Sequence, residues 1–92
     1  MDSYNLIVTI EGQPPKQLTF SQPRITIGRE AGDVVVPDPM CSSSHAELVW
    51  QNGRLTYRDL GSTNGSFLLG QRIQQVELLQ GSIVQIGNST IQ

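Results

Sequence analysis

Alternation of apolar and polar residues at a period of two runs through most of this chain of 92 residues. Successive side chains of a strand point to opposite faces of a sheet, so a strand buried on one face shows this period. The pattern therefore predicts short, half-buried strands along almost the whole chain. The segments that carry it are 6–10, 18–20, 25–27, 46–51, 55–58, 83–86 and 90–91, and the β-branched run at 34–36 also favours a strand.

Turn-forming residues separate these segments at short intervals. Asn52-Gly53 lies between two alternating segments, and both residues tolerate the positive φ that a tight hairpin requires. Gly87-Asn88 predicts a second tight hairpin, and Leu69-Gly70 a third, although leucine suits that place poorly. Many short strands with frequent turns predict an all-β fold, a two-sheet β-sandwich of about ten or eleven strands with ligand loops at one end.

Residues 71–80 leave two interpretations open. The spacing of Ile73, Val76 and Leu79 suits a short helix as well as a strand. Glycines bracket the segment closely on both sides, and this favours extended structure.

Length, charge and cysteine content restrict the domain organisation and the partners. We expect residues 1–92 to form a single domain, a module of a longer protein. A net charge of -2 argues against nucleic acid, which selects strongly basic surfaces. The single cysteine, Cys41, excludes an internal disulfide and suits a reducing, cytoplasmic compartment. We expect no membrane association, because no apolar stretch approaches the roughly 20 residues of a membrane helix.

Catalysis is not expected from the residue pattern. Ser44, His45 and Asp59 superficially resemble a hydrolase set, but neighbouring residues of a strand point to opposite faces. One cysteine and one histidine are too few soft ligands for a structural zinc site. We therefore predict that the chain is not an enzyme and uses neither a metal nor another cofactor.

Three polar segments interrupt the strand pattern: Gly28-Arg29, Ser42–His45 and Gly61–Gly65. The arginine offers a fixed fork of donors that matches the oxygens of a phosphate group. The serine and threonine hydroxyls add donors without bulk, and the glycines let the backbone turn sharply. If the fold brings the three segments together, they can hold a phosphate group that the protein does not hydrolyse.

The order and spacing of these segments resemble the motifs of the forkhead-associated (FHA) domain. The matching motifs are Gly28-Arg29-Glu30, Ser42-x-x-His45-Ala46, the segment from Asp59 to Phe67, and a closing pattern from Leu79 to Gly87. The resemblance runs from about residue 25 to residue 87. It implies a two-sheet β-sandwich whose loops at one end bind phosphothreonine in a partner protein, downstream of a Ser/Thr kinase.

The resemblance also implies roles for single residues. The residues implied to bind the phosphopeptide are Arg29, Ser42, Ser43, Thr63 and Asn64, and those implied to support the site are Gly28, His45 and Gly65. Of these, Arg29, Ser42, Ser43 and Thr63 are expected to bind the phosphate, and Asn64 is expected to bind the backbone of the peptide. His45 is expected beneath the loops, where it props them.

One departure from the family leaves a second function open. Ser43 stands where the family usually has arginine, asparagine or lysine, so this site carries less positive charge. The alternative is a scaffold that keeps the FHA fold and binds its partner without phosphate. Arg24, Arg72 and residues 69–71 are candidates for selecting the residues around the phosphothreonine.

Other residues are interpreted as purely structural or solvated. Trp50, Tyr57 and Phe67 are predicted to lie in the core. Glu30 and Asp38 are interpreted as solvated loop charges.

Overall fold

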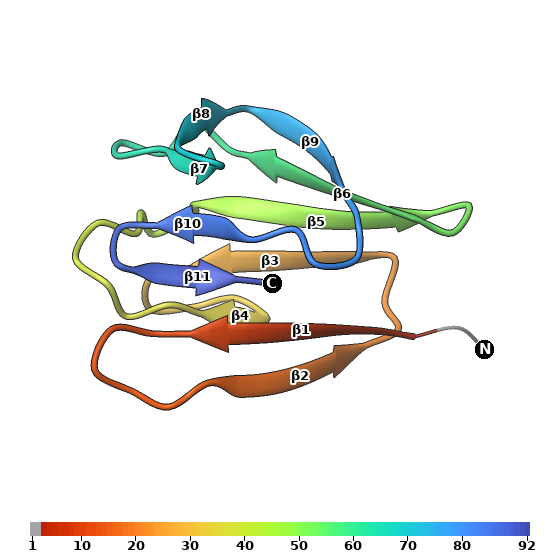
Figure 1. Cartoon of the computed structure of the whole chain (residues 1–92), viewed down its shortest axis with the longest axis horizontal. Coiled ribbons are helices and arrows are strands. Elements are labelled where there is room, and N and C mark those ends of the chain that lie inside the picture. The colour runs from red at the N-terminus through yellow and green to blue at the C-terminus, as the bar shows by residue number, and fades with distance from the viewer. Residues whose placement is uncertain (1–2) are drawn as a thin grey trace.

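Eleven strands form two sheets that pack face to face, in a computed structural model that describes residues 3–92 (Figure 1). This architecture confirms the predicted all-β sandwich of ten or eleven strands. The strands are β1 (Tyr4–Thr9), β2 (Lys16–Phe20), β3 (Arg24–Gly28), β4 (Val34–Val35), β5 (Ala46–Gln51), β6 (Arg54–Asp59), β7 (Ser66–Leu68), β8 (Gln71–Ile73), β9 (Gln75–Leu78), β10 (Val84–Ile86) and β11 (Ser89–Ile91).

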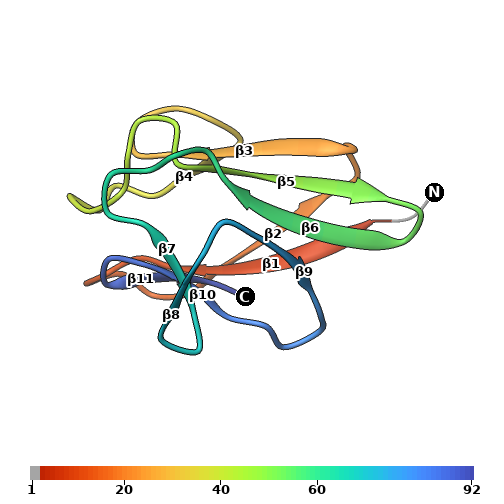
Figure 2. The same ribbon diagram turned by 90° about the horizontal axis from the view of Figure 1, so that it is seen from above.

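The two sheets contain six and five strands. Their orders are β2-β1-β11-β10-β7-β8 and β4-β3-β5-β6-β9. Only the short pair of β3 and β4 is parallel among the described strand pairs, and the others are antiparallel. Figure 2 shows the two layers from above, with several connecting loops gathered at one end.

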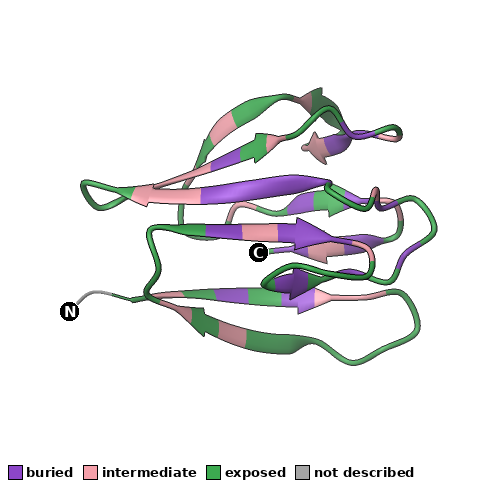
Figure 3. Cartoon of the chain, turned by 180° about the vertical axis from the view of Figure 1, so that it is seen from behind, coloured by how far each residue is buried: buried purple, intermediate pink, exposed green. Residues whose placement is uncertain are grey.

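The core lies between the sheets and follows the alternation of the sequence. Ile25, Leu48 and Tyr57 are fully buried neighbours across three strands, since Leu48 pairs with Ile25 on one side and with Tyr57 on the other. Buried and more exposed residues alternate along several strands in Figure 3. Trp50 and Phe67 are only partly buried, so of the three aromatic residues predicted in the core only Tyr57 is completely enclosed.

The predicted tight turns are present. Asn52 and Gly53 have φ values of 55° and 74°, and Leu69 and Gly70 have values of 51° and 78°. Positive φ at both central residues matches the twist of a two-residue hairpin. Leu69 is also 96% exposed, so neither its backbone nor its side chain is stabilised by local packing. Gly87, at φ 58°, starts the turn between β10 and β11.

Most of residues 71–80 are extended, as the bracketing glycines indicated. They form β8 in the six-stranded sheet and β9 in the five-stranded sheet, so this segment crosses from one sheet to the other. The helical interpretation is therefore wrong. Within residues 3–92 no helix is long and apolar enough to cross a membrane.

Candidate functional site

The three polar segments meet at one end of the sandwich because of the strand register. Ala46, the first residue of β5, pairs with Ile27 near the end of β3 and with Asp59 at the end of β6. The loops that leave β3, enter β5 and leave β6 therefore start side by side. Figure 2 shows them together at the left end.

Hydrogen bonds join the three segments directly, and Ser42 takes part in most of them. The backbone N–H of Arg29 donates to the Ser42 carbonyl oxygen at 3.1 Å. The backbone N–H of Thr63 donates to the Ser42 hydroxyl oxygen, also at 3.1 Å. The Asn64 amide donates to the carbonyl oxygen of Met40 at 3.3 Å. The β4–β5 loop is thus tied to both of the other loops.

Gly28 allows the β3–β4 and β4–β5 loops to approach each other. A Cβ atom at this position would lie 2.2 Å from the Ser43 carbonyl oxygen and 2.4 Å from that of Ala31. Both neighbours are backbone atoms, so any side chain would push the loops apart. Glycine is required here by the close contact, and this contact positions the residues on either side of it.

His45 is completely buried beneath these loops. Its Nδ1 accepts a hydrogen bond from the Ser42 N–H at 2.9 Å, which places the proton of a neutral ring on Nε2. Nε2 lies 3.1 Å from the Gly65 carbonyl oxygen and 3.2 Å from the Ser66 hydroxyl. Burial lowers the pKa of His45, against the opposing effects of Asp59 and of the Gly65 carbonyl. The ring is therefore neutral at pH 7 and joins two loops.

Asp59 holds the β6–β7 loop from below. One carboxylate oxygen accepts from the Ser62 N–H at 2.8 Å, and the other accepts from the hydroxyls of Ser62 and Ser66 at 2.6 and 2.7 Å. The Ser66 hydroxyl in turn lies 2.6 Å from the hydroxyl of Tyr57. Burial alone would raise the pKa of Asp59, but the hydrogen bonds from Ser62 and Ser66 outweigh it and the pKa is lowered. The carboxylate therefore stays charged.

Sequence reasoning did not find this supporting role of Asp59. The sequence pattern that could have indicated this role is the Asp-x-x-Ser spacing at the start of a loop, in which the aspartate side chain typically caps the turn. The hydrolase arrangement is absent, because the His45 ring is occupied by Ser42, Gly65 and Ser66 while Ser44 is exposed. Among residues 3–92 no group of three metal-ligating side chains gathers.

The accessible side chains of the three polar segments include several hydrogen-bond donors. The Arg29 side chain is 43% exposed, and its ion-pair contact is a long one of 3.8 Å from Nε to Glu30. Ser43 and Thr63 are exposed, and their hydroxyls have no hydrogen-bond partner within the described part of the chain. The Ser42 hydroxyl oxygen accepts from Thr63, which leaves its proton free to donate. The three polar segments thus offer one guanidinium and three hydroxyls.

Asp38 is buried, so the interpretation of this residue as a solvated loop charge is wrong. Its carboxylate accepts hydrogen bonds from the N–H groups of Met40 and Asn88, at 2.9 and 3.0 Å, and from the Ser89 hydroxyl at 2.9 Å. It therefore fastens the β4–β5 loop to the turn between β10 and β11. A residue 50 positions away supplies the partner, and no local pattern in the sequence reveals it.

Asp38→Asn is expected to lower the free energy of unfolding by about 1–3 kcal/mol at pH 7, because at least one of the donors then faces an amide N–H instead of an oxygen. Burial would raise the pKa of Asp38, but the hydrogen bonds from Met40, Ser89 and Asn88 prevail and lower it below the ordinary 3.8. The stabilisation is therefore complete above that value and is lost as the pH falls below it. Urea denaturation at pH 7 and pH 3 measures both effects.

The control for this variant is Glu30→Gln, which removes an equal charge from a side chain that is 83% exposed. We expect this control to leave the unfolding free energy within about 0.5 kcal/mol of the wild type. Equal losses in the two variants would show that Asp38 acts only through the net charge.

The structure separates the two arginines that were candidates for peptide selection. Arg24 lies at the start of β3, opposite to the end that carries Arg29, and pairs with Glu47 on the outer face of the sheet. Arg72, in contrast, contacts the β6–β7 loop, where its Nη2 donates to the Ser62 carbonyl oxygen at 3.3 Å. Only Arg72 is placed beside the joined loops.

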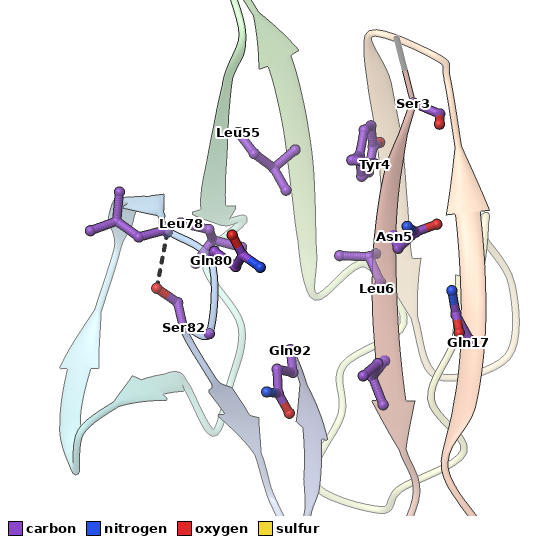
Figure 4. A pocket seen from close by; sticks show the side chains of 13 residues that line it. Ser3, Tyr4, Asn5, Leu6, Gln17, Leu55, Leu78, Gln80, Ser82 and Gln92 are labelled. Carbon is purple, nitrogen blue, oxygen red and sulfur yellow. Dashed lines mark hydrogen bonds between the residues drawn. The ribbon is translucent and has the colours of Figure 1, made fainter.

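A cavity of about 690 Å³ lies away from this site (Figure 4). It is lined by the first residues of β1, by Leu55 and Leu78 of the opposite sheet, and by the loop that follows β9. None of the residues lining it belongs to the three polar segments. The joined loops, rather than this cavity, carry the chemistry of the site.

Comparison with known proteins identifies the family. Residues 25–87, most of the chain, match the family model described as the FHA domain. The chain belongs to the FHA family. The FHA domain is a non-catalytic binding module, which agrees with the prediction that the chain is not an enzyme.

Similar proteins support this assignment. The ABC transporter ATP-binding/permease protein Rv1747 of Mycobacterium tuberculosis is 39% identical over 77 residues, which are 80% of this chain and 9% of that protein. The crystal structure of the Rv1747 FHA-1 domain has a TM-score of 0.76 at 30% identity, covering 96% of this chain and 94% of the other. This chain spans 9% to 57% of the length of the curated relatives that it matches.

A second structure, from a study of phosphothreonine-dependent FHA domain interactions, has a TM-score of 0.82. Its sequence is 24% identical, and the match covers 96% of this chain and 93% of that one. At this identity the similarity shows that the two chains share a fold.

Proposed function

We propose that this FHA domain is a phosphothreonine-dependent binding module that recognises a phosphorylated segment of a partner protein in Ser/Thr-kinase signalling. The observation that carries the proposal is the chain of hydrogen bonds from Arg29 through Ser42 to Thr63. These hydrogen bonds bring the three polar segments together into a single patch of donors, although none of the segments by itself indicates a phosphate site. The phosphothreonine-dependent interactions of an FHA domain with the same fold support the choice of ligand.

Each site residue has a distinct part in the proposal. The Arg29 guanidinium provides the positive charge and a planar fork of N–H donors for a phosphate of about -1.5 to -2 charges. The hydroxyls of Ser42, Ser43 and Thr63 donate to the remaining phosphate oxygens. Asn64 binds the peptide backbone in place of the Met40 carbonyl oxygen, to which its amide otherwise donates.

The supporting residues hold this arrangement in place before the ligand arrives. Gly28 permits the close approach of two loops, and His45 joins Ser42 to Gly65. Donors that are already placed lose little freedom on binding, which favours affinity. Three or four hydrogen bonds to a charged group contribute roughly 1.5–3 kcal/mol each to the free energy of binding. After the cost of association is subtracted, the affinity expected is roughly micromolar.

Calorimetric titration with matched phosphothreonine and unmodified peptides tests the proposal. We expect the phosphorylated peptides of a library to yield micromolar binders, and the same peptides without phosphate to bind at least about 100-fold more weakly. The alternative, a scaffold that binds its partner without phosphate, is favoured by Ser43 at a place that is often cationic. Equal affinities for the members of each pair would select this alternative and overturn the proposal.

A further inference from the structure

Arg72 lies beside the β6–β7 loop because of the pairing of β7 with β8. Ser66 pairs with Ile73 and Phe67 with Arg72, so the side chain of Arg72 starts next to the end of that loop. Its guanidinium lies against Gly65, where a Cβ atom would be 2.8 Å from Nε and 3.1 Å from Cζ. The φ of Gly65, 87°, also favours glycine, so the same residue makes the turn and leaves the space that Arg72 fills.

The charge of Arg72 is not neutralised by an acidic side chain within residues 3–92. The ion pairs that the structure forms there involve Arg24 and Arg58 with Glu47, and Arg29 with Glu30. Arg72 instead donates one N–H to the Ser62 carbonyl oxygen. A guanidinium has five N–H donors, so four remain. Arg72 is also exposed, and these donors are accessible from solvent.

Arg29 and Arg72 flank the joined loops. The backbone of Arg29 bonds to Ser42, Ser42 bonds to Thr63, and the residue before Thr63 bonds to Arg72. A peptide that crosses the joined loops with its phosphate at Arg29 therefore also passes the loop that Arg72 contacts. The carbonyl of Ser62 and the backbone of Gly65 restrict the guanidinium in advance, which reduces the entropy lost when it binds.

We propose that Arg72 binds the carboxylate of an aspartate or glutamate near the phosphothreonine, and that this domain therefore prefers acidic phosphopeptides. The proposal rests on the phosphopeptide-binding function proposed above. The net charge of the chain, -2, works against acidic partners in general, so the preference has to come from a local cation. Of the four described arginines other than Arg29, three, namely Arg24, Arg54 and Arg58, lie on the inner strands β3 and β6 of the five-stranded sheet. Of these four described arginines, only Arg72 contacts a site loop.

Fluorescence anisotropy with a set of phosphothreonine peptides tests this assignment. Each peptide carries one aspartate, at one of the four positions on either side of the phosphothreonine, and is compared with the same peptide carrying asparagine. We expect aspartate to strengthen binding about three- to tenfold at one position or at adjacent ones. Arg72→Gln is expected to abolish this advantage while leaving the affinity for the asparagine peptides within about twofold.

Arg54→Gln is the matched control, since it removes an equal charge at the β5–β6 hairpin, the other end of the sandwich (Figure 1). It should retain the aspartate preference, and loss of the preference in this variant would show a long-range effect of net charge and overturn the assignment. An aspartate advantage that survives in Arg72→Gln would also overturn it, as would an absence of any advantage in the wild type. If only the assignment of Arg72 is wrong, the asparagine-containing phosphopeptides still bind more tightly than the same peptides without phosphate. If the proposed phosphopeptide-binding function is wrong, phosphorylated and unphosphorylated peptides bind equally.

Discussion

Arg29→Ala is expected to weaken the binding of a phosphothreonine peptide by at least about 100-fold. The substitution removes the guanidinium of Arg29 and with it two or more charge-assisted hydrogen bonds, each worth roughly 1.5–3 kcal/mol. The fold should persist, because the bond that Arg29 makes to Ser42 comes from its backbone N–H and alanine retains it. Calorimetric titration gives the affinity, and thermal unfolding checks that the domain is intact.

Two further variants make this test specific. Arg29→Lys keeps the charge but loses the planar fork, so an intermediate loss is expected. Arg54→Ala lowers the net charge equally at the opposite end of the sandwich and should bind like the wild type. Unchanged affinity in a folded Arg29→Ala domain would mean that the phosphate lies elsewhere, and the proposed site would then be wrong.

His45→Ala is expected to lower the free energy of unfolding by about 3 kcal/mol, because it leaves a cavity and deprives several buried groups of a partner. The groups that lose a hydrogen bond are the N–H of Ser42 and the carbonyl of Gly65 or the hydroxyl of Ser66. A small domain of this kind has only about 5–15 kcal/mol of stability, so the loss is a large share. Urea denaturation measures the loss directly.

Ser44→Ala provides the control for His45, because Ser44 is the exposed neighbour and makes no side-chain hydrogen bond to any other described residue. It should change the unfolding free energy by less than about 0.5 kcal/mol. A loss in His45→Ala no larger than in Ser44→Ala would show that the loops do not depend on the imidazole.

The pH dependence of stability separates the role of His45 from simple packing. Since burial lowers the pKa of His45 below its ordinary 6.5, the unfolded chain takes up a proton more readily than the folded one. Stability is therefore complete above about pH 6.5 and decreases as the pH falls through the lowered value. His45→Asn should lack this decrease, because asparagine does not titrate, and only the later loss from the carboxylates below about pH 4 should remain.

The elements of the fold that depend on local chemistry were predictable from the sequence. Asn52-Gly53 and Gly87-Asn88 form the turns that their φ preferences indicate, and the alternation in β1 and β10 matches their buried and exposed faces. The strand character of residues 71–80 followed from the bracketing glycines. The order and spacing of the polar motifs indicated the FHA family, although each motif alone is an ordinary loop sequence.

The supporting contacts of the site were not predictable, since their partners are remote in the sequence. Asp38 resembles any loop aspartate until its partners Asn88 and Ser89 are seen. Arg24 and Arg72 were equivalent candidates by composition, yet strand register puts one on an outer face and the other against Gly65. Burial and hydrogen bonding to distant residues decide such roles.

The sequence alone determined the strand periodicity, the turns and the identity of the donors, because backbone preference and hydrogen-bonding chemistry belong to single residues and their neighbours. Only the tertiary structure decided which donors share a patch, which acids are buried and which arginine remains accessible. These properties depend on which strands pair and in which register, and a shift of one residue would turn every side chain of a strand to the other face.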